Sequence, residues 1–117
     1  MDLSSQTHGT VELVTLPARL VMANARQTRL AIKALVDGGR TRLVLDLQNV
    51  EFIDSSGLSV LVSTMQVVQQ RDGKVVLLSP SSGVRSLIEL TRLHQIFEIF
   101  EDREAAIYDL NEHQVTP

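Results

Sequence analysis

Short runs of apolar and β-branched residues alternate along the chain with longer segments in which apolar residues recur every three or four positions. The first pattern is typical of β-strands and the second of amphipathic helices. One run is continuously apolar after its first lysine, as expected for a central strand that is covered on both faces. Strands are predicted over Val11 to Leu16, Thr41 to Leu47 and Lys74 to Leu78, with a short edge strand within "QIFEIF", residues 95–100.

The predicted helices are placed by apolar spacing together with capping signals. Asn24 reads as an N-cap with Gln27 three positions later, and "DGG" at residues 37–39 ends this first helix, because glycine adopts the left-handed conformation of a helix C-terminus without a clash. A second helix is predicted over Ser55 to Arg71, and further helices within Ser79 to Leu93 and Glu101 to Leu110. The expected buried positions are Ala25, Thr28, Ile32 and Leu35 in the first helix, and Leu58, Leu61, Val62, Met65 and Val68 in the second.

This alternation of strands and helices predicts an α/β fold in which the later strands are parallel and are joined by right-handed crossovers. No linker or low-complexity tract interrupts the pattern, so residues 1–117 are expected to form a single domain with a core from about residue 11 to 110 and short flexible termini. At 44% hydrophobic residues, a chain of this length buries a useful core without disulfides or metal.

Composition and charge narrow the possible partners. The net charge is −3, which argues against nucleic acid as the main partner because such proteins concentrate lysine and arginine. The chain has no cysteine and no cluster of histidine and acidic residues, so neither a metal site nor a cofactor is expected. Its start lacks the features of a secretion signal, and no apolar run is long enough to span a membrane. We therefore expect a cytoplasmic protein that binds other proteins or small molecules, with no membrane association.

Enzyme motifs do not fit this layout. A hydrolase nucleophile elbow requires glycine two residues before the serine, where the sequence has Asp54 before Ser56. His8, His94 and His113 fall in an expected frayed start, a loop and a frayed end, so no catalytic base is evident. The glycine-rich loops that bind nucleotides are also absent. The sequence therefore predicts a protein that is not an enzyme.

The tetrapeptide "DSSG", residues 54–57, lies where a strand is predicted to give way to a helix. Ser55 reads as a helix cap, and a hydroxyl in this place faces unpaired backbone N–H groups and the positive end of the helix dipole. A phosphate ester is electrostatically favoured there. Phosphorylation would add about −1.5 to −2 charges beside Asp54, enough to repel a partner that packs on this spot. Ser55 is thus a candidate binding switch.

The helix that follows carries no charged side chain from Ser55 through Gln70. Val60, Thr64 and Val67 form a second stripe, separate from the main apolar face. Such an uncharged and partly apolar face suits a docking partner. The alternative is a helix buried on both sides within its own domain, in which case a charge at Val60 would impair folding rather than binding.

The segments "LVLDLQNVEFIDSSGLSVLV" and "GKVVLLSPSSGVRSLIELTRLHQIFEIFEDREAAI" resemble the STAS domain, and most closely the stand-alone bacterial anti-sigma factor antagonists. The resemblance extends from about Val11 to Leu110. It implies a small mixed sheet of about four to five strands, the first of them antiparallel, with about four helices packed mainly on one face. It also implies a role in which the antagonist binds a serine-kinase-type anti-sigma factor and thereby frees the sigma factor.

The same resemblance assigns roles to the "DSSG" residues. Ser55 matches the serine that the kinase phosphorylates, Ser56 a possible secondary acceptor, Asp54 the preceding acid, and Gly57 the residue that keeps the helix start open. A metal-dependent serine phosphatase is implied as the enzyme that resets the switch. Partner contacts are expected at Leu58, Ser59, Val60, Thr64, Val67 and Arg19.

One segment departs from the family pattern. Many members carry an acidic turn resembling Gly-Glu-Leu-Asp after the early strand, where this chain has "ARLV", Ala18 to Val21. Arg19 therefore implies a partner with a different and more acidic surface. A second role stays open, that of a constitutive STAS subunit resembling the small component of lipid-transport ABC systems, in which phosphorylation has no part.

Overall fold

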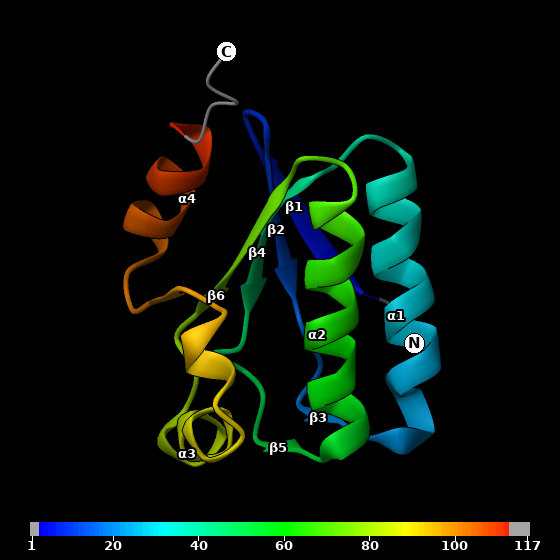
Figure 1. Ribbon diagram of the computed structural model, residues 1–117, viewed down its shortest axis with the longest axis vertical. Coiled ribbons are helices and arrows are strands. Elements are labelled where there is room, and N and C mark those ends of the chain that lie inside the picture. Colours follow the sequence, from blue (N-terminus) through cyan, green and yellow to red (C-terminus); the bar gives the residue numbers. More distant parts are fainter. Residues whose placement is uncertain (1–2, 113–117) are drawn as a thin grey trace.

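A five-stranded mixed sheet forms the centre of the protein in the computed structural model, which describes residues 3–112 (Figure 1). The strand order is β1-β2-β4-β6-β7, with β1 antiparallel to β2 and every later neighbour parallel. The crossovers between parallel strands each contain a helix, as the alternating pattern predicted. The five strands are β1 (Ser4–His8), β2 (Val11–Thr15), β4 (Arg42–Asp46), β6 (Lys74–Leu78) and β7 (Ile99–Phe100).

Helices cover both faces of this sheet. The helices α1 and α2 lie on one face and α4 lies on the other (Figure 1). Helix α3 shares the core of the α1 and α2 side through Val84 and Ile88. The expectation of helices mainly on one face is therefore confirmed. The helices are α1 (Met22–Asp37), α2 (Ser55–Gln69), α3 (Ser82–Leu90) and α4 (Arg103–Asn111), with a short 3-10 helix η1 (Leu93–Gln95) after α3.

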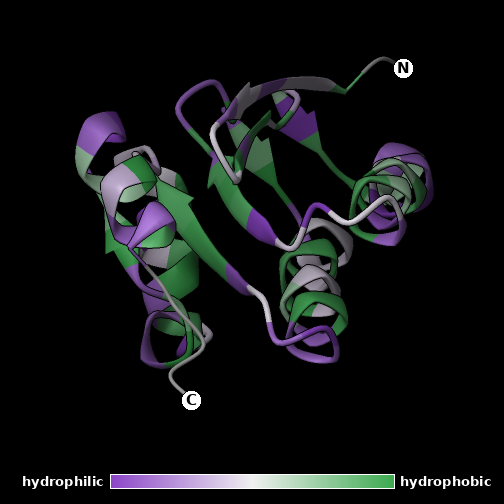
Figure 2. Cartoon of the chain, turned by 90° about the horizontal axis from the view of Figure 1, so that it is seen from above, coloured by the Kyte–Doolittle hydropathy of each residue, from purple (hydrophilic) through white to green (hydrophobic). Residues whose placement is uncertain are grey.

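The central strands are apolar on both sides because both faces are covered. In β6, Val75 and Leu77 point into the core beneath α1, α2 and α3, whereas Val76 and Leu78 point into a second core beneath α4. Seen from above, these strands are largely hydrophobic between the two layers of helices (Figure 2). This arrangement explains why Lys74 to Leu78 reads as a continuous apolar run instead of an alternating one.

The start of α1 differs from the prediction. The helix begins at Met22, so Asn24 is its third residue and not its N-cap. The Asn24 side chain accepts a hydrogen bond from the backbone N–H of Val21 at 2.9 Å and donates one to the carbonyl oxygen of Arg19 at 2.7 Å. Asparagine therefore supports the helix start from inside the first turn. Along the same helix Val36 is buried where Leu35 was expected, and Leu35 is half-buried.

The predicted frayed N-terminal segment contains a strand. Residues Ser4–His8 pair with β2 as an antiparallel edge strand. His8 ends this strand, with its Nε2 3.2 Å from a guanidinium nitrogen of Arg103 in α4. His94 lies in η1, and His113 lies outside the described residues. The edge strand escaped prediction because four of its five residues are exposed and polar.

Candidate functional site

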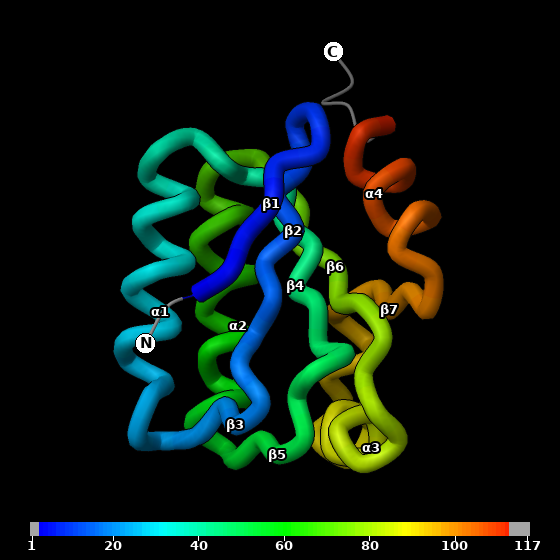
Figure 3. Tube along the Cα trace, turned by 180° about the vertical axis from the view of Figure 1, so that it is seen from behind, coloured from blue at the N-terminus to red at the C-terminus, as the bar shows by residue number. Residues whose placement is uncertain are grey.

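The first turn of α2 is positioned by a second, two-stranded sheet that the sequence did not predict. Strand β3 (Arg19–Leu20) pairs in parallel with β5 (Phe52–Ile53). Because β3 directly precedes α1 and β5 directly precedes α2, the two helices start side by side, as the trace in Figure 3 shows. The backbone N–H of Asp54 extends this pairing by donating to the carbonyl oxygen of Leu20 at 3.3 Å.

The Asp54 carboxylate binds the first turns of both helices. One oxygen accepts the backbone N–H of Gly57 at 2.9 Å and so caps α2. The other accepts the backbone N–H of Met22, the first residue of α1, at 3.0 Å. The Gly57 N–H, and after it that of Met22, holds the pKa of the Asp54 carboxyl below its ordinary value against an opposing effect of desolvation. Asp54 is therefore a charged group shared by two helix N-termini.

Ser55 is the first residue of α2 and does not cap it, contrary to the prediction. Its side chain is exposed, and within residues 3–112 its hydroxyl has no hydrogen-bond partner. Ser56 follows as a half-buried neighbour. Because Asp54 already satisfies the Gly57 N–H, the Ser55 hydroxyl is left free for chemistry without loss of the cap.

Gly57 allows α2 to approach β3 closely. A Cβ atom at this position would lie 2.6 Å from Cγ1 of Ile53 and well inside van der Waals contact of the Leu20 carbonyl oxygen. Neither neighbour can move away easily, because the Leu20 oxygen belongs to the backbone of β3 and the Ile53 side chain is only 2% exposed. Glycine is thus required at position 57 because no side chain fits between α2 and β3. This role is more specific than the role expected from the sequence, which was to keep the helix start open.

An exposed and largely apolar patch lies beside Ser55. Met22 is 77% exposed and Phe52 is 47% exposed, although both are large hydrophobic residues. The guanidinium carbon of Arg19 lies 5.0 Å from the centre of the Phe52 ring, within the range of a cation–π contact. The sequence prediction included Arg19 but missed Met22 and Phe52. The pairing of β3 with β5, two residues each, places Phe52 opposite Arg19 and two residues before Asp54, with its side chain exposed.

The predicted docking stripe on α2 is largely internal. Val60 is 0% exposed and Thr64 is 3% exposed, so the expectation that they form a partner surface is wrong. Helix α1 packs along this side of α2, which is the alternative that the sequence left open. The Thr64 hydroxyl is also occupied, since it donates to the carbonyl oxygen of Val60 at 2.8 Å. Of the other expected contacts, Ser59 and Arg19 are exposed, and Leu58 and Val67 are half-buried.

The sequence is similar to that of a known protein family. The family model of the STAS domain matches residues 2–106. The Bordetella bronchiseptica protein BtrV, assigned to the anti-sigma factor antagonists, is 37% identical over 84 residues, which is 72% of each chain.

Two solved structures share the fold. A Thermotoga maritima protein assigned to the anti-sigma factor antagonists superposes with a TM-score of 0.87 at 24% identity, covering 94% of this chain and 95% of its own. The Bacillus cell fate determinant SpoIIAA in its phosphorylated form has a TM-score of 0.73 at 21% identity, covering 92% of this chain and 98% of its own. Within residues 3–112 no helix has the length and apolar character needed to cross a membrane. Because the STAS family model matches residues 2–106, the chain belongs to the STAS domain family, and its relatives include anti-sigma factor antagonists.

Proposed function

We propose that this protein is an anti-sigma factor antagonist that binds a serine-kinase-type anti-sigma factor and is released when that kinase phosphorylates Ser55. The observation that carries the proposal is the free and exposed Ser55 hydroxyl beside an exposed apolar patch. The assignment of the relative BtrV to the anti-sigma factor antagonists supports the proposed role, and the existence of a phosphorylated form of SpoIIAA supports control by phosphorylation.

The surface around Ser55 suits a protein partner. Met22 and Phe52 supply apolar area that is exposed to solvent in the isolated chain, and Arg19 adds a positive charge at its margin. Large apolar side chains and arginine are enriched at the contact centres of protein interfaces. Because Arg19 stands where many relatives carry an acidic turn, the partner here presents a carboxylate opposite it.

The chemistry at Ser55 belongs to the partner. No side chain within residues 3–112 accepts a hydrogen bond from the Ser55 hydroxyl, so no base of this chain activates it. The Ser55 oxygen attacks the γ-phosphorus of ATP in the kinase, an oxygen–phosphorus bond forms as the bond to ADP breaks, and the hydroxyl proton passes to a base of the kinase. A metal-dependent serine phosphatase restores the hydroxyl by hydrolysis. This chain acts as the acceptor and not as an enzyme, and Ser56 is the secondary acceptor.

Phosphorylation changes the charge of the surface more than its shape. The phosphate lies at the positive end of the α2 dipole, which favours it, so the fold is preserved. It adds about −1.5 to −2 charges next to Asp54, whose lowered pKa keeps that carboxylate ionised. An apolar contact surface thereby becomes strongly anionic. Like-charge contact with the partner's carboxylates and the cost of desolvating the phosphate then weaken binding by more than tenfold.

The test compares Ser55→Asp and Ser55→Ala in calorimetric titration against a kinase-type anti-sigma factor. Ser55→Asp is expected to lose binding by at least about tenfold, while Ser55→Ala binds and takes up no phosphate at position 55. Ser82→Asp is the matched control, because Ser82 is likewise an exposed first residue of a helix whose cap is the preceding residue, Ser81. It should bind as the unmodified protein does.

Measurement of the free energy of unfolding distinguishes a loss of binding from a loss of folding in these variants. Ser55→Ala should leave the free energy of unfolding unchanged, because Asp54 and not Ser55 caps α2, whereas Ser81→Ala should lose about 1 kcal/mol with its cap. Equal affinity of Ser55→Asp, Ser55→Ala and the unmodified protein, without phosphate uptake on Ser55, would contradict the proposal and favour a constitutive STAS subunit.

A further inference from the structure

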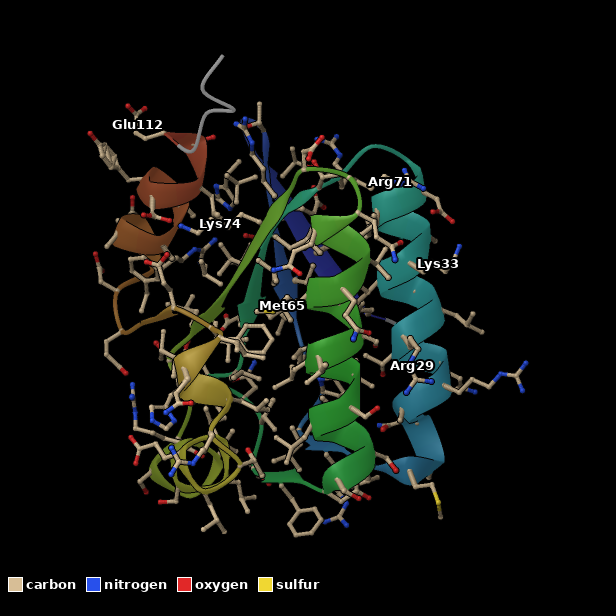
Figure 4. All side chains as sticks on the ribbon, viewed as in Figure 1. Arg29, Lys33, Met65, Arg71, Lys74 and Glu112 are labelled. Carbon is tan, nitrogen blue, oxygen red and sulfur yellow. The ribbon has the colours of Figure 1, made fainter. Side chains whose placement is uncertain are left out.

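A groove runs between α1 and α2 on the side of these helices that faces away from the sheet. Its volume is about 250 Å³, and it is lined by Arg29, Ile32 and Lys33 from α1 and by Ser63, Thr64 and Val67 from α2. In Figure 4 Arg29 lies where α1 faces α2, and Arg71 lies at the far end of the same two helices. Arg71 bridges that end through hydrogen bonds to Asp37 at 2.7 Å and to the carbonyl oxygen of Val36 at 3.2 Å.

The floor of the groove is apolar. Ile32 is 2% exposed and Val67 is half-buried. The hydroxyls of Ser63 and Thr64 both donate to the carbonyl oxygen of Val60, at 3.1 and 2.8 Å. These polar groups are therefore satisfied within α2, and a molecule in the groove meets mainly hydrocarbon.

The rim is positively charged. None of the six lining residues is acidic. The Nε of Arg29 donates to the Ser63 hydroxyl at 3.3 Å, and within residues 3–112 its guanidinium forms no ion pair, so its remaining N–H groups are open to an anion. Lys33 lies next to it and pairs with Asp37 at 2.8 Å. An apolar floor with a cationic rim is complementary to an amphiphilic anion.

We propose that this groove binds a small organic monocarboxylate, with its apolar body on Ile32 and Val67 and its carboxylate on Arg29. The volume sets the size of the ligand. Since a cavity of about 150 Å³ accommodates benzene, a groove of 250 Å³ accommodates roughly ten non-hydrogen atoms, which corresponds to a carboxylate of about eight carbons. A protein partner fits less well, because a stable interface needs about 800 Å² from each side, and the exposed Lys33 lies on the rim of this groove.

The proposal also accounts for the uncharged surface of α2. No side chain from Ser55 through Gln70 is charged, and Val60 and Thr64 are buried against α1. Val67, on the same stripe, lines the groove instead. A charged residue at this position would place an ion on the apolar floor. The site is separate from Ser55 and does not depend on the proposed phosphorylation.

The test is a titration with sodium octanoate, followed by two-dimensional NMR of the backbone amides and the isoleucine and valine methyl groups. Saturable shifts are expected at Ile32 and Val67, and 1-octanol, which has the same body without the charge, should bind about tenfold more weakly. Arg29→Gln should weaken octanoate binding by about tenfold and Arg29→Lys by less, because lysine keeps the charge. Arg26→Gln is the matched control, since Arg26 is an exposed arginine of α1 that does not line the groove.

A second variant tests the floor. Val67→Phe fills the groove from a half-buried position and should abolish the octanoate shifts while the amide spectrum stays that of a folded protein. Absence of saturable shifts in the unmodified protein would overturn the proposal. So would shifts that Arg29→Gln and Arg26→Gln reduce equally, because binding would then reflect the general charge of α1.

Discussion

Replacement of Gly57 by alanine adds a single methyl group at the point where α2 meets β3. That methyl carbon would lie 2.6 Å from Ile53 Cγ1 and closer still to the Leu20 carbonyl oxygen. The oxygen cannot rotate away without losing the hydrogen bond that it accepts from the Asp54 N–H. Helix α2 must therefore shift away from β3, which disturbs the turn that presents Ser55.

The change in the free energy of unfolding of Gly57→Ala follows from two opposing effects. Alanine is intrinsically more favourable than glycine in a helix by up to about 1 kcal/mol. Insertion of a methyl group into a closely packed contact costs about 1 to 3 kcal/mol, and the upper part of that range applies because the obstacle includes backbone. A net loss of about 2 kcal/mol is expected. Gly83→Ala provides the opposite case, because a Cβ at Gly83 in α3 meets no atom within 4 Å, so this variant should be neutral or more stable by up to about 1 kcal/mol.

Urea unfolding followed by circular dichroism measures both variants under the same conditions. The free energies of unfolding of Gly57→Ala and Gly83→Ala should differ by about 2 to 3 kcal/mol, which corresponds to roughly 8 °C or more in Tm for a domain of this size. Equal urea midpoints for the two variants would contradict this expectation. In that case the approach of α2 to Leu20 would not be what requires glycine at position 57.

Two further predictions concern burial and pH. Val60→Asp places an unpaired charge at a position that is 0% exposed and should destabilise the fold by more than about 3 kcal/mol. Ser59→Asp, on the exposed side of the same helix, should change the free energy of unfolding by no more than about 0.5 kcal/mol. Similar urea midpoints for the two variants would show that Val60 is accessible. The pKa of Asp54 is lowered from 3.8 by folding, so its contribution to stability is present above pH 3.8 and is lost as the pH falls through the folded-state pKa. The stability difference between the unmodified protein and Asp54→Asn should therefore shrink on acidification, and a difference that stays the same over this pH range would contradict the role of the Asp54 carboxylate.

The central strands and the long second helix were predictable because their residues repeat with a clear period. Lys74 to Leu78 and Ser55–Gln69 are long enough for apolar spacing to identify them. The edge strand β1 was not predictable in this way, since its exposed residues leave no apolar alternation. The start of α1 was misplaced because Asn24 is a favoured N-cap residue, although here it acts from the third helical position while Val21 occupies the cap.

The candidate site was predictable only in part. The "DSSG" tetrapeptide located the helix start and the exposed serine, but Asp54 and Ser55 are both acceptable caps, and sequence spacing does not choose between them. Apolar spacing likewise identified the Val60 and Thr64 stripe without indicating that α1 covers it. Met22 and Phe52 join the site through the β3–β5 pairing, which is a contact between segments far apart in the chain. Such non-local contacts have no local sequence signal.

The hydrogen bond from Met22 to Asp54 joins residues that are 32 positions apart. The loop-closure entropy of a contact over this separation must be offset by the packing of the elements between the two residues, among them α1 and β4. The geometry around Ser55 therefore depends on the folded domain and not on the local peptide alone. A kinase that recognises this geometry, as proposed for Ser55, would distinguish the folded domain from an unfolded chain with the same peptide sequence, and the proposed phosphorylation would then report on the folded state as well as on the signal.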